Sequence, residues 1–487
     1  MTQIFKSNQF PFWMLALTVV TALILPVVLQ EGMFMDGVLY ACVSNNLAQG
    51  FGSMWFLKFS ELGFANFATF HEHPPLIFWI QGLFFKLFGS SMYVERFYTF
   101  GTALIATWLL HKNWKLINYK DTALSKNAWL AVVFWMLIPI VFWSYRNNVQ
   151  ENTMTIFVLL SSFFALKAIH LKKKVILNLV LSGIMVFAAS FAKGVPGFFP
   201  LVIVPAFWLV YRPFSFIKMI AYSFVVTAAC VISYLLILLI PEARESLSIY
   251  VFERLLRRVD VQPTVDSHFY IMIRLFMEVL PLIVIVVVVH FILWLKKIPR
   301  KITKTHWRVI GFFFILGICG SLPVMLTLVQ KTFYIGSSLP YFAICFAMMV
   351  APLFSERSAK IDVSKKGFKF FKWTTVIGFI AVIVFSITQS GKVSRNEEVL
   401  ADVHTLGEIV PHHSLMSVDP MLTDHWDLHV YLMRYYNISM DHRTEVHQPY
   451  LLVDKTLPFE IDSAYHIVDV PTVKYDLYHL ENSEQSD

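Results

Sequence analysis

The sequence carries little charge for its length. Of its 487 residues, 15% are charged and 57% are hydrophobic, and the mean hydropathy is +0.62. An average soluble domain is about a quarter charged. This chain could bury an ordinary core several times over, so we expect the remaining apolar surface to face lipid. The composition excludes an ordinary soluble globular protein.

Cysteine is also scarce and forms no pattern. The four cysteines, Cys42, Cys230, Cys319 and Cys345, show neither a CxxC pair nor any other metal-ligand spacing. Such residues are expected to act as small apolar side chains. The sequence therefore indicates neither a disulfide framework nor a cysteine metal site.

The signatures of soluble cofactors are missing. We find no Walker A loop, GxGxxG fingerprint, serine-hydrolase motif or flavin motif, and neither an internal repeat nor a low-complexity tract. Nothing in the sequence therefore indicates that a soluble nucleotide supplies a group for transfer. A site on the outer face would instead use a donor linked to a lipid.

Long apolar runs fill most of the first 390 residues. The first run has no A-x-A cleavage pattern after it, so we interpret it as a retained span. The sequence therefore predicts a polytopic α-helical membrane protein with about 11–13 transmembrane helices. The runs that span a bilayer, or nearly so, are 10–29, 92–111, 128–145, 152–170, 175–192, 196–211, 217–240, 271–295, 308–330, 333–352 and 373–390.

The charges between these runs predict the orientation. The loops 111–120, 171–174, 296–308 and 365–372 are rich in Lys and Arg and fall on one side of the membrane. The positive-inside rule makes that side cytoplasmic. The N-terminus is then inside, and the segment after Ser390 is outside. We expect a multi-pass protein of the cytoplasmic (inner) membrane with a periplasmic C-terminal domain.

The net charge of +8 divides unequally along the chain. The first 390 residues hold 34 basic and 15 acidic residues, a net charge of +19, whereas residues 391–487 hold 6 basic and 17 acidic residues, a net charge of −11. The positive charge thus belongs to the membrane part. It indicates membrane topology and anionic ligands, not nucleic acid.

The acidic segment 391–487 is expected to fold as a small soluble α/β domain, separate from a membrane domain 1–390. Helical periodicity and alternating apolar residues both occur in it. The predicted helices are 396–410 and 424–437, and the predicted strands are 414–419, 438–441, 450–455 and 465–470.

Residues 30–96 are predicted to form one large extracytoplasmic loop packed on the membrane. Within it, "PPLIFWIQGLFFKLFG" (74–89) is marginal as a span and suits a helix at the lipid interface. His71, Glu72 and His73 precede it directly. Two histidines one residue apart, with no third ligand in view, do not define a metal site. No cofactor is predicted, and a divalent-metal requirement stays open.

Ionisable residues from separate parts of the chain fall on this outer face. Any one of them could be a simple interfacial side chain, but their convergence predicts a functional site. Carboxylates can take a proton from an attacking hydroxyl or amine, and Arg and Lys suit a phosphate or diphosphate. The candidates are Asp36, His71, Glu72, His73, Arg96, Arg146, Glu151, Lys193, the cluster from Glu253 to Arg258, Lys331 and Tyr334.

The order of these features resembles a known family. An acidic residue follows the first span, then come PPL-x-x-W, Gly with Glu-Arg, a second acidic residue, an AKG turn and K-x-x-Y-x-x-x-x-x-P. This pattern, over roughly residues 10–350, is similar to the polytopic GT-C glycosyltransferases related to protein O-mannosyltransferases and the lipid A aminoarabinose transferase.

The resemblance implies roles for individual residues. Asp36 and Glu151 would be catalytic acidic residues, with Asp36 activating the acceptor. The polyprenyl phosphate of the donor would be held by Lys193, Arg257, Arg258, Lys331, Tyr334 and His73. Two positions depart from the family: Asp36-Gly37 stands where the family often has Asp-Glu, and His73-Pro74-Pro75 stands where aminoarabinose transferases have Lys-Pro-Pro. A histidine can still hydrogen-bond a phosphate.

We therefore expect a glycosyltransferase that moves a hexose or pentose from a polyprenyl-phosphate-linked donor to a lipid, glycan or protein acceptor at the outer membrane face. Membrane lipids are its further partners. One alternative is a transporter or flippase of a lipid-linked anion, which would show paired repeats and broken helices. Another is a sensor whose acidic C-terminal segment binds a ligand.

Overall fold

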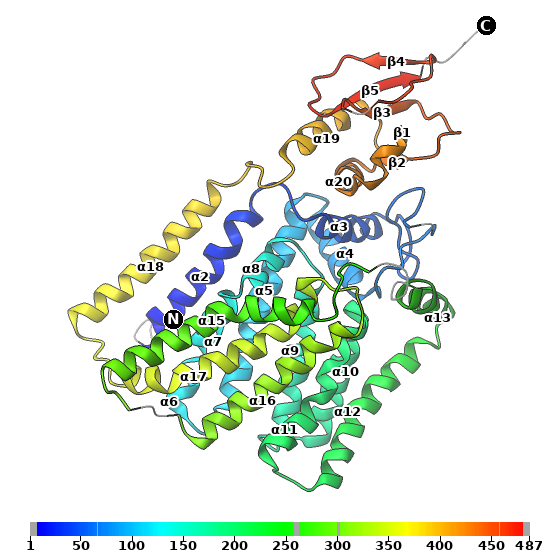
Figure 1. Cartoon of the computed structure of the whole chain (residues 1–487). Helices are drawn as coiled ribbons and strands as arrows, with labels where there is room; N and C mark the ends of the chain where they lie inside the picture. Colours follow the sequence, from blue (N-terminus) through cyan, green and yellow to red (C-terminus); the bar gives the residue numbers. More distant parts are fainter. Residues whose placement is uncertain (1–6, 66, 258–262, 300–301, 457, 481–487) are drawn as a thin grey trace. The chain divides into compact units, whose positions relative to one another are not determined.

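The computed structural model describes residues 7–65, 67–257, 263–299, 302–456 and 458–480. The chain divides into two compact units (Figure 1). The first comprises Met1–Leu29, Glu72–Ile77 and Thr99–Gln389; the second comprises Gln30–His71, Phe78–Tyr98 and Ser390–Asp487.

The first unit is helical. Short 3₁₀ helices cover Val195–Val202, Leu322–Leu326 and Thr332–Ser338, and a π-helix covers Ile249–Leu256. The α-helices are α2 (Phe10–Val28), α5 (Tyr93–Ile117, which begins in the second unit), α6 (Thr122–Ser125), α7 (Ala128–Met136), α8 (Pro139–Arg146), α9 (Glu151–Ile169), α10 (Val175–Lys193), α11 (Ile203–Tyr211), α12 (Phe216–Ile237), α13 (Pro241–Ser248), α15 (Tyr270–Leu295), α16 (Lys304–Ser321), α17 (Leu339–Ala359) and α18 (Lys366–Ile387).

The helices confirm a polytopic membrane protein. In the described part of the chain, eight helical segments are long and apolar enough to cross a bilayer, or nine if the bent pair α7 and α8 counts as one span. These eight coincide with eight of the eleven predicted runs. The remaining three runs fall on the charged helix α5, on the bent pair, and on the shorter apolar helix Val195–Tyr211. The number of described helices that are long and apolar enough to cross a bilayer is therefore lower than the predicted 11–13.

The bend between α7 and α8 is 76°. Pro139 occupies the first turn of α8, where its missing N–H costs nothing. The next N–H, that of Ile140, donates to the Glu278 carboxylate of α15 at 2.7 Å. Burial raises the cost of leaving either group unpaired, so this bond holds the start of α8 against α15.

The second unit combines helices with a five-stranded sheet. Its helices are α3 (Met35–Ala48), α4 (Leu76–Phe88, which begins in the first unit), α19 (Glu397–Ile409) and α20 (Trp426–Tyr436). The strands are β1 (Leu415–Val418), β2 (Ser439–Asp441), β3 (Tyr450–Asp454), β4 (Tyr465–Val468) and β5 (Tyr475–Leu480), in the order β2-β1-β3-β5-β4.

Each predicted C-terminal helix and strand has a counterpart in the structure, so the small α/β fold is confirmed. Strand β1 pairs with β2 and β3 in parallel, and β5 pairs with β3 and β4 in antiparallel. Strand β5 was not predicted. Its start is held by Asp402 of α19, whose carboxylate accepts hydrogen bonds from the backbone N–H groups of residues 473–475 at 2.5 to 3.1 Å.

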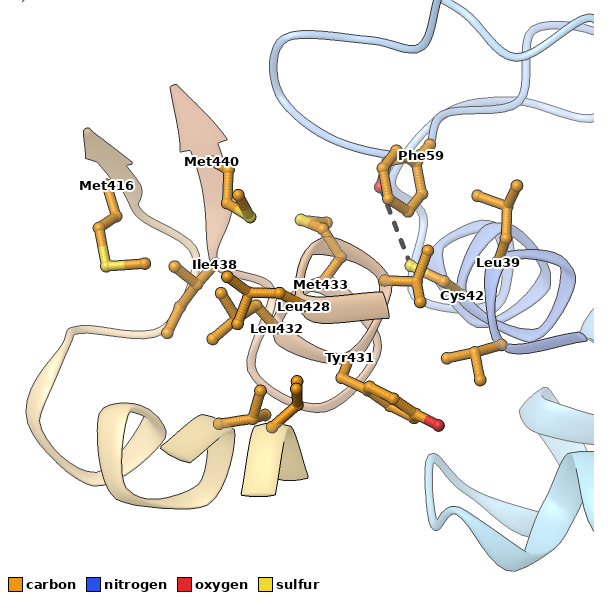
Figure 2. Close-up of a cluster of buried hydrophobic side chains, with 14 of the residues drawn as sticks. Leu39, Cys42, Phe59, Met416, Leu428, Tyr431, Leu432, Met433, Ile438 and Met440 are labelled. Carbon is orange, nitrogen blue, oxygen red and sulfur yellow. Dashed lines mark hydrogen bonds between the residues drawn. The ribbon is translucent and has the colours of Figure 1, made fainter. Parts of the chain in front are cut away.

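The core of the second unit joins distant segments of sequence. Figure 2 shows α20 between α3 and the strands β1 and β2, with Leu428 and Leu432 beside Ile438, and with Cys42 of α3 facing Phe59. The hydroxyl of Tyr431 both donates to Met33 O and accepts from Met33 N, each at 2.9 Å. The loop 30–71 and the C-terminal segment therefore form one core.

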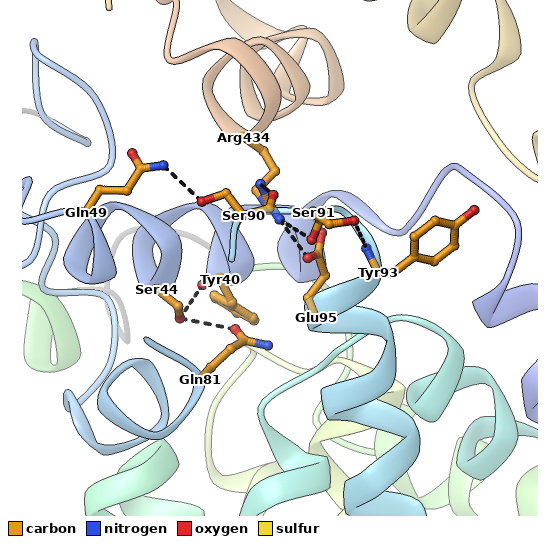
Figure 3. A network of polar contacts seen from close by, with 9 residues as sticks. All are labelled: Tyr40, Ser44, Gln49, Gln81, Ser90, Ser91, Tyr93, Glu95 and Arg434. Atoms are coloured by element: carbon orange, nitrogen blue, oxygen red, sulfur yellow. Dashed lines mark hydrogen bonds and ion pairs between the residues drawn. The ribbon is translucent and has the colours of Figure 1, made fainter. Parts of the chain in front are cut away.

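A buried arginine strengthens this connection (Figure 3). Arg434, at the end of α20, donates to Ser90 O at 3.0 Å, Ser91 O at 3.1 Å and the Glu95 carboxylate at 2.8 Å. The Arg434 and Glu95 side chains are 2% and 3% exposed. Charges buried to this extent need partners, so this pair specifies how α20 packs against the start of α5.

Replacing Arg434 by methionine is expected to destabilise the second unit by about 3–5 kcal/mol, because Glu95 stays buried without its partner. Thermal unfolding of the purified protein in detergent, together with protease digestion of the C-terminal segment, measures this change. Arg395→Met, at an exposed position of the same unit, is the control and should change stability by less than about 0.5 kcal/mol. Equal stability of the two variants would show that the Arg434 pair contributes nothing.

Candidate active site

Lys193 lies at the centre of the charged residues in the first unit. It is the last residue of α10, and its Nζ lies 3.4 Å from Glu151 Oε1 and 3.3 Å from His73 Nε2. Its ammonium also lies over the Tyr334 ring, 5.7 Å from the ring centroid. Four predicted site residues from separate parts of the chain therefore meet at one point.

Local backbone geometry explains why Lys193 ends its helix. Gly194 follows it with φ +87° and ψ −144°, a region that L-residues avoid. A Cβ at Gly194 would lie 2.1 Å from the Tyr250 hydroxyl. Both the backbone angle and this close approach require glycine. The AKG turn noted in the sequence thus positions the lysine.

Glu151 is the first residue of α9 and is only 1% exposed. A carboxylate is favoured at a helix N-terminus by the N–H dipoles of the first turn. The side chains of Glu151 and Lys193 are 2% and 5% exposed, so each offsets the cost of removing the other from water. The result is a buried carboxylate and a buried ammonium held together.

A second ion pair lies one residue from His73. Glu72 pairs with Arg254, and their side chains are 11% and 22% exposed. Arg254 belongs to the π-helix Ile249–Leu256, and π-helical turns occur frequently at functional sites. Glu72, which was predicted, thus brings an arginine close to the Lys193 cluster.

The neighbouring arginines differ from Arg254. Arg257 pairs with Glu253 at 2.9 Å within the same helical segment, and its side chain is 70% exposed. Arg258 lies outside the described residues. Sequence reasoning chose Arg257 and Arg258 for the phosphate, whereas in the structure Arg254 contacts a residue adjacent to His73. Nothing in the sequence FERLLRR distinguishes Arg254 from Arg257 or Arg258 as the residue that binds the phosphate.

Lys331 and Tyr334 occupy the 3₁₀ helix Thr332–Ser338 and its N-cap. The Tyr334 N–H donates to Lys331 O at 3.0 Å, which fixes their relative position. Arg274 of α15 donates from Nε to the Thr332 hydroxyl at 3.0 Å. Tyr334 therefore approaches Lys193 from a segment that α15 holds in place.

Arg146 is engaged in the packing of its own helix. Its Nε donates to Leu23 O of α2 at 2.5 Å, and its guanidinium lies 4.8 Å from the Phe142 ring centroid. These contacts fix the end of α8 just before Glu151. Arg146 thus supports the site residues instead of reaching the Lys193 cluster.

Three predicted residues belong to the second unit. Asp36 is half-buried in the first turn of α3, and Arg96 lies in the first turn of α5 with 1% exposure. His71 is 4% exposed, and its Nε2 lies 2.7 Å from the Thr69 hydroxyl. The His71-Glu72-His73 stretch is thus divided: His71 is held within the second unit, and the next two residues reach charged groups of the first.

The described residues contain no group of three or more His, Cys, Asp or Glu side chains placed to hold a metal ion. The cluster at Lys193 offers one carboxylate and one histidine around an ammonium, and an ammonium repels a cation. Its chemistry suits anionic and hydroxyl-bearing ligands.

Comparison with solved structures defines the class of the fold. The chain matches the crystal structure of ArnT from Cupriavidus metallidurans bound to undecaprenyl phosphate, with a TM-score of 0.61, 14% identity, and coverage of 96% of this chain and 98% of that chain. It matches the apo form with a TM-score of 0.57, 13% identity and 96% coverage of both chains. The fold of the chain is therefore that of the ArnT structures.

A family model matches one part of the sequence. Residues 72–237, about a third of the chain, match the family described as dolichyl-phosphate-mannose-protein mannosyltransferase. No curated protein sequence matches the chain. The matched segment contains Glu72, His73, Glu151 and Lys193. The comparisons thus show an ArnT-like fold for the chain and a mannosyltransferase-family match for one part of it.

The Lys193–Glu151 pair should behave as an energetic unit. Lys193→Met leaves a buried carboxylate, Glu151→Gln leaves a buried ammonium, and each is expected to cost about 3–5 kcal/mol. The double variant should cost clearly less than the two singles added together. Thermal unfolding of the four proteins in detergent measures this coupling. Strictly additive losses would show that the two groups do not depend on one another.

Proposed function

We propose that the protein transfers a sugar from a polyprenyl-phosphate-linked donor to an acceptor at the outer face of the cytoplasmic membrane. The observation that carries this proposal is the buried meeting of Lys193, Glu151, His73 and Tyr334 within a GT-C fold. A lipid-linked donor also agrees with the missing nucleotide motifs, since its carrier is supplied by the membrane itself.

The reaction breaks the bond between the anomeric carbon and the phosphate oxygen and joins that carbon to an acceptor oxygen or nitrogen. Negative charge grows on the departing polyprenyl phosphate. Lys193 and Arg254 are each paired with a carboxylate in this structure. When the donor binds, they donate hydrogen bonds to its phosphate. His73 and Tyr334 supply further hydrogen bonds, and Lys331 adds charge from the same segment as Tyr334.

The proton of the acceptor must go to a base. Glu151 is the carboxylate of the Lys193 cluster, and its release from Lys193 on phosphate binding makes it available for this role. The family resemblance assigns acceptor activation to Asp36, in the first turn of α3. Glu151 and Asp36 are therefore substituted separately in the transfer assay.

The C-terminal segment 391–487 is proposed to lie in the periplasm and to contribute to acceptor selection, with 1–390 as the catalytic membrane domain. Its net charge of −11 favours acceptors that are neutral or basic where they approach it. The acceptor is a lipid, a glycan or a protein.

One observation favours the transporter alternative. The α7–α8 pair is a broken helix, and the carboxylate of Glu278 caps the second half. Broken helices line the sites of many transporters, where they occur as related pairs. Within the part of the chain that the structure describes, one such bent pair is found. A direct assay of transfer separates the two functions.

The assay presents labelled mannose, glucose or galactose on polyprenyl phosphate to wild type, Glu151→Gln and Asp36→Asn in detergent with a lipid acceptor pool. Wild type should release polyprenyl phosphate and label an acceptor, and loss of a general base should lower kcat by about 10²-fold or more. If Glu151→Gln unfolds, Glu151→Asp replaces it: this variant keeps the charge but draws the carboxylate back by one methylene group, and the misplaced base should also lower kcat. Movement of the donor between leaflets of proteoliposomes without any transfer would favour the transporter.

A pair of arginine variants tests the phosphate site. Arg254→Gln should raise KM for the donor about tenfold or more, because a charge-assisted hydrogen bond to phosphate is lost. Arg257→Gln removes the same charge from an exposed position and should leave KM within about twofold. Initial rates against donor concentration give both values. The opposite ranking would assign the phosphate to Arg257.

A further inference from the structure

Gln150 is a buried amide that the mechanism above does not use. It directly precedes Glu151 and is 1% exposed. Both its Oε1 and its Nε2 are buried, and neither finds a hydrogen-bond partner among the described residues. Buried polar side chains are nearly always hydrogen-bonded, so an amide with both ends unsatisfied calls for a specific explanation.

The loop that carries Gln150 is otherwise firmly held. Asn147 donates to Trp143 O at 2.9 Å, and Asn152 donates to the Thr99 hydroxyl at 3.1 Å and to Ser144 O at 2.9 Å. The Gln150 carbonyl accepts from Met154 N at 3.1 Å as α9 begins. The backbone on both sides of the amide is therefore fixed, while the amide itself is left for another group.

A second glutamine shows the ordinary arrangement. Gln330 is 2% exposed, nearly the same burial as Gln150. Its Oε1 accepts from Ile271 N at 2.9 Å, and its Nε2 donates to His268 O at 3.1 Å and Thr327 O at 2.8 Å. Gln330 thus shows that a glutamine buried as deeply as Gln150 can obtain a full set of hydrogen bonds in this fold.

We propose that the Gln150 side chain hydrogen-bonds a hydroxyl of the sugar that is transferred, and so selects the donor. This inference rests on the proposed function. The two unsatisfied atoms of Gln150 need one hydrogen-bond donor and one acceptor. A phosphate only accepts hydrogen bonds, and a polyprenyl chain neither donates nor accepts them, whereas a hydroxyl both donates and accepts. A sugar ring delivered next to Glu151 presents such groups. Gln150 is then a specificity-determining residue.

If this proposal is right, replacing Gln150 by methionine should change stability and activity in opposite directions. Gln150→Met keeps the shape of the side chain and removes two unsatisfied polar atoms, so the Tm in detergent should stay the same or rise. Transfer of the preferred sugar should fall about 10- to 100-fold in kcat/KM, since a site built to bond a hydroxyl loses it. Gln330→Met is the matched control and should lower the Tm.

The decisive measurement uses the polyprenyl-phosphate hexose that wild type transfers best, together with its singly deoxygenated analogues. Gln150→Met should be slower than wild type on every donor but one. On the analogue lacking the hydroxyl that Gln150 bonds, the two proteins should agree within about twofold. That single exception identifies the hydroxyl.

Other outcomes overturn the proposal in distinguishable ways. If wild type is active and Gln150→Met matches it on all donors, or is slower on all of them by one factor, Gln150 does not read a hydroxyl and the proposed function stands. A fall in Tm like that of Gln330→Met would assign Gln150 a structural partner and also reject the proposal. If wild type transfers neither a hexose nor a pentose from polyprenyl phosphate, the proposed function fails together with this inference.

Discussion

The need to keep a buried charge paired governs the arrangement of the first unit. Lys193 and Glu151 lie almost out of water, and neither would be tolerated alone at that depth. The pair therefore requires α10 to end and α9 to begin at the same level, with the segment 72–77 beside them. The positive φ of Gly194 and the helix-start position of Glu151 both serve this requirement. Under the proposed function, the same pair supplies the lysine that would bind the donor phosphate and the carboxylate that would take up the acceptor proton.

The fold could be predicted from sequence to the extent that apolar length determines it. Eight of the predicted spans are long continuous helices, because an apolar run of about 20 residues has few other structures available in lipid. The exceptions have local causes. Pro139 breaks one run into α7 and α8, and the charges of α5 lower its hydropathy below that of a typical span. Strand β5 depends on Asp402, which lies about 70 residues earlier, and no local pattern reveals that contact.

The members of the Lys193 cluster could be predicted from the sequence, but their contacts could not. Lys193, Glu151, His73 and Tyr334 were all predicted candidates, because polar and charged groups at the ends of apolar spans are costly unless they are paired or lie in a polar site. Their mutual contacts span 120 residues of sequence between His73 and Lys193 and 141 between Lys193 and Tyr334. Arg254 belonged to the predicted cluster Glu253–Arg258 but received no role in phosphate binding, because its orientation depends on a π-helix, and π-helical turns are too rare to be predicted from a sequence. Gln150 was missed for another reason: an uncharged amide beside a carboxylate attracts no attention until its burial is known.

The two-part core of the second unit has a consequence for biogenesis. Met33 and Tyr431, which share two hydrogen bonds, are 398 residues apart. The loop 30–71 is synthesised early, whereas α20, which covers its apolar side chains, is synthesised only after the spans of the first unit. The loop must therefore wait, incompletely folded, while the remaining spans insert. Its closure depends on contacts of very high sequence separation, which form slowly. Assembly of this unit is thus expected only after the spans of the first unit have been synthesised.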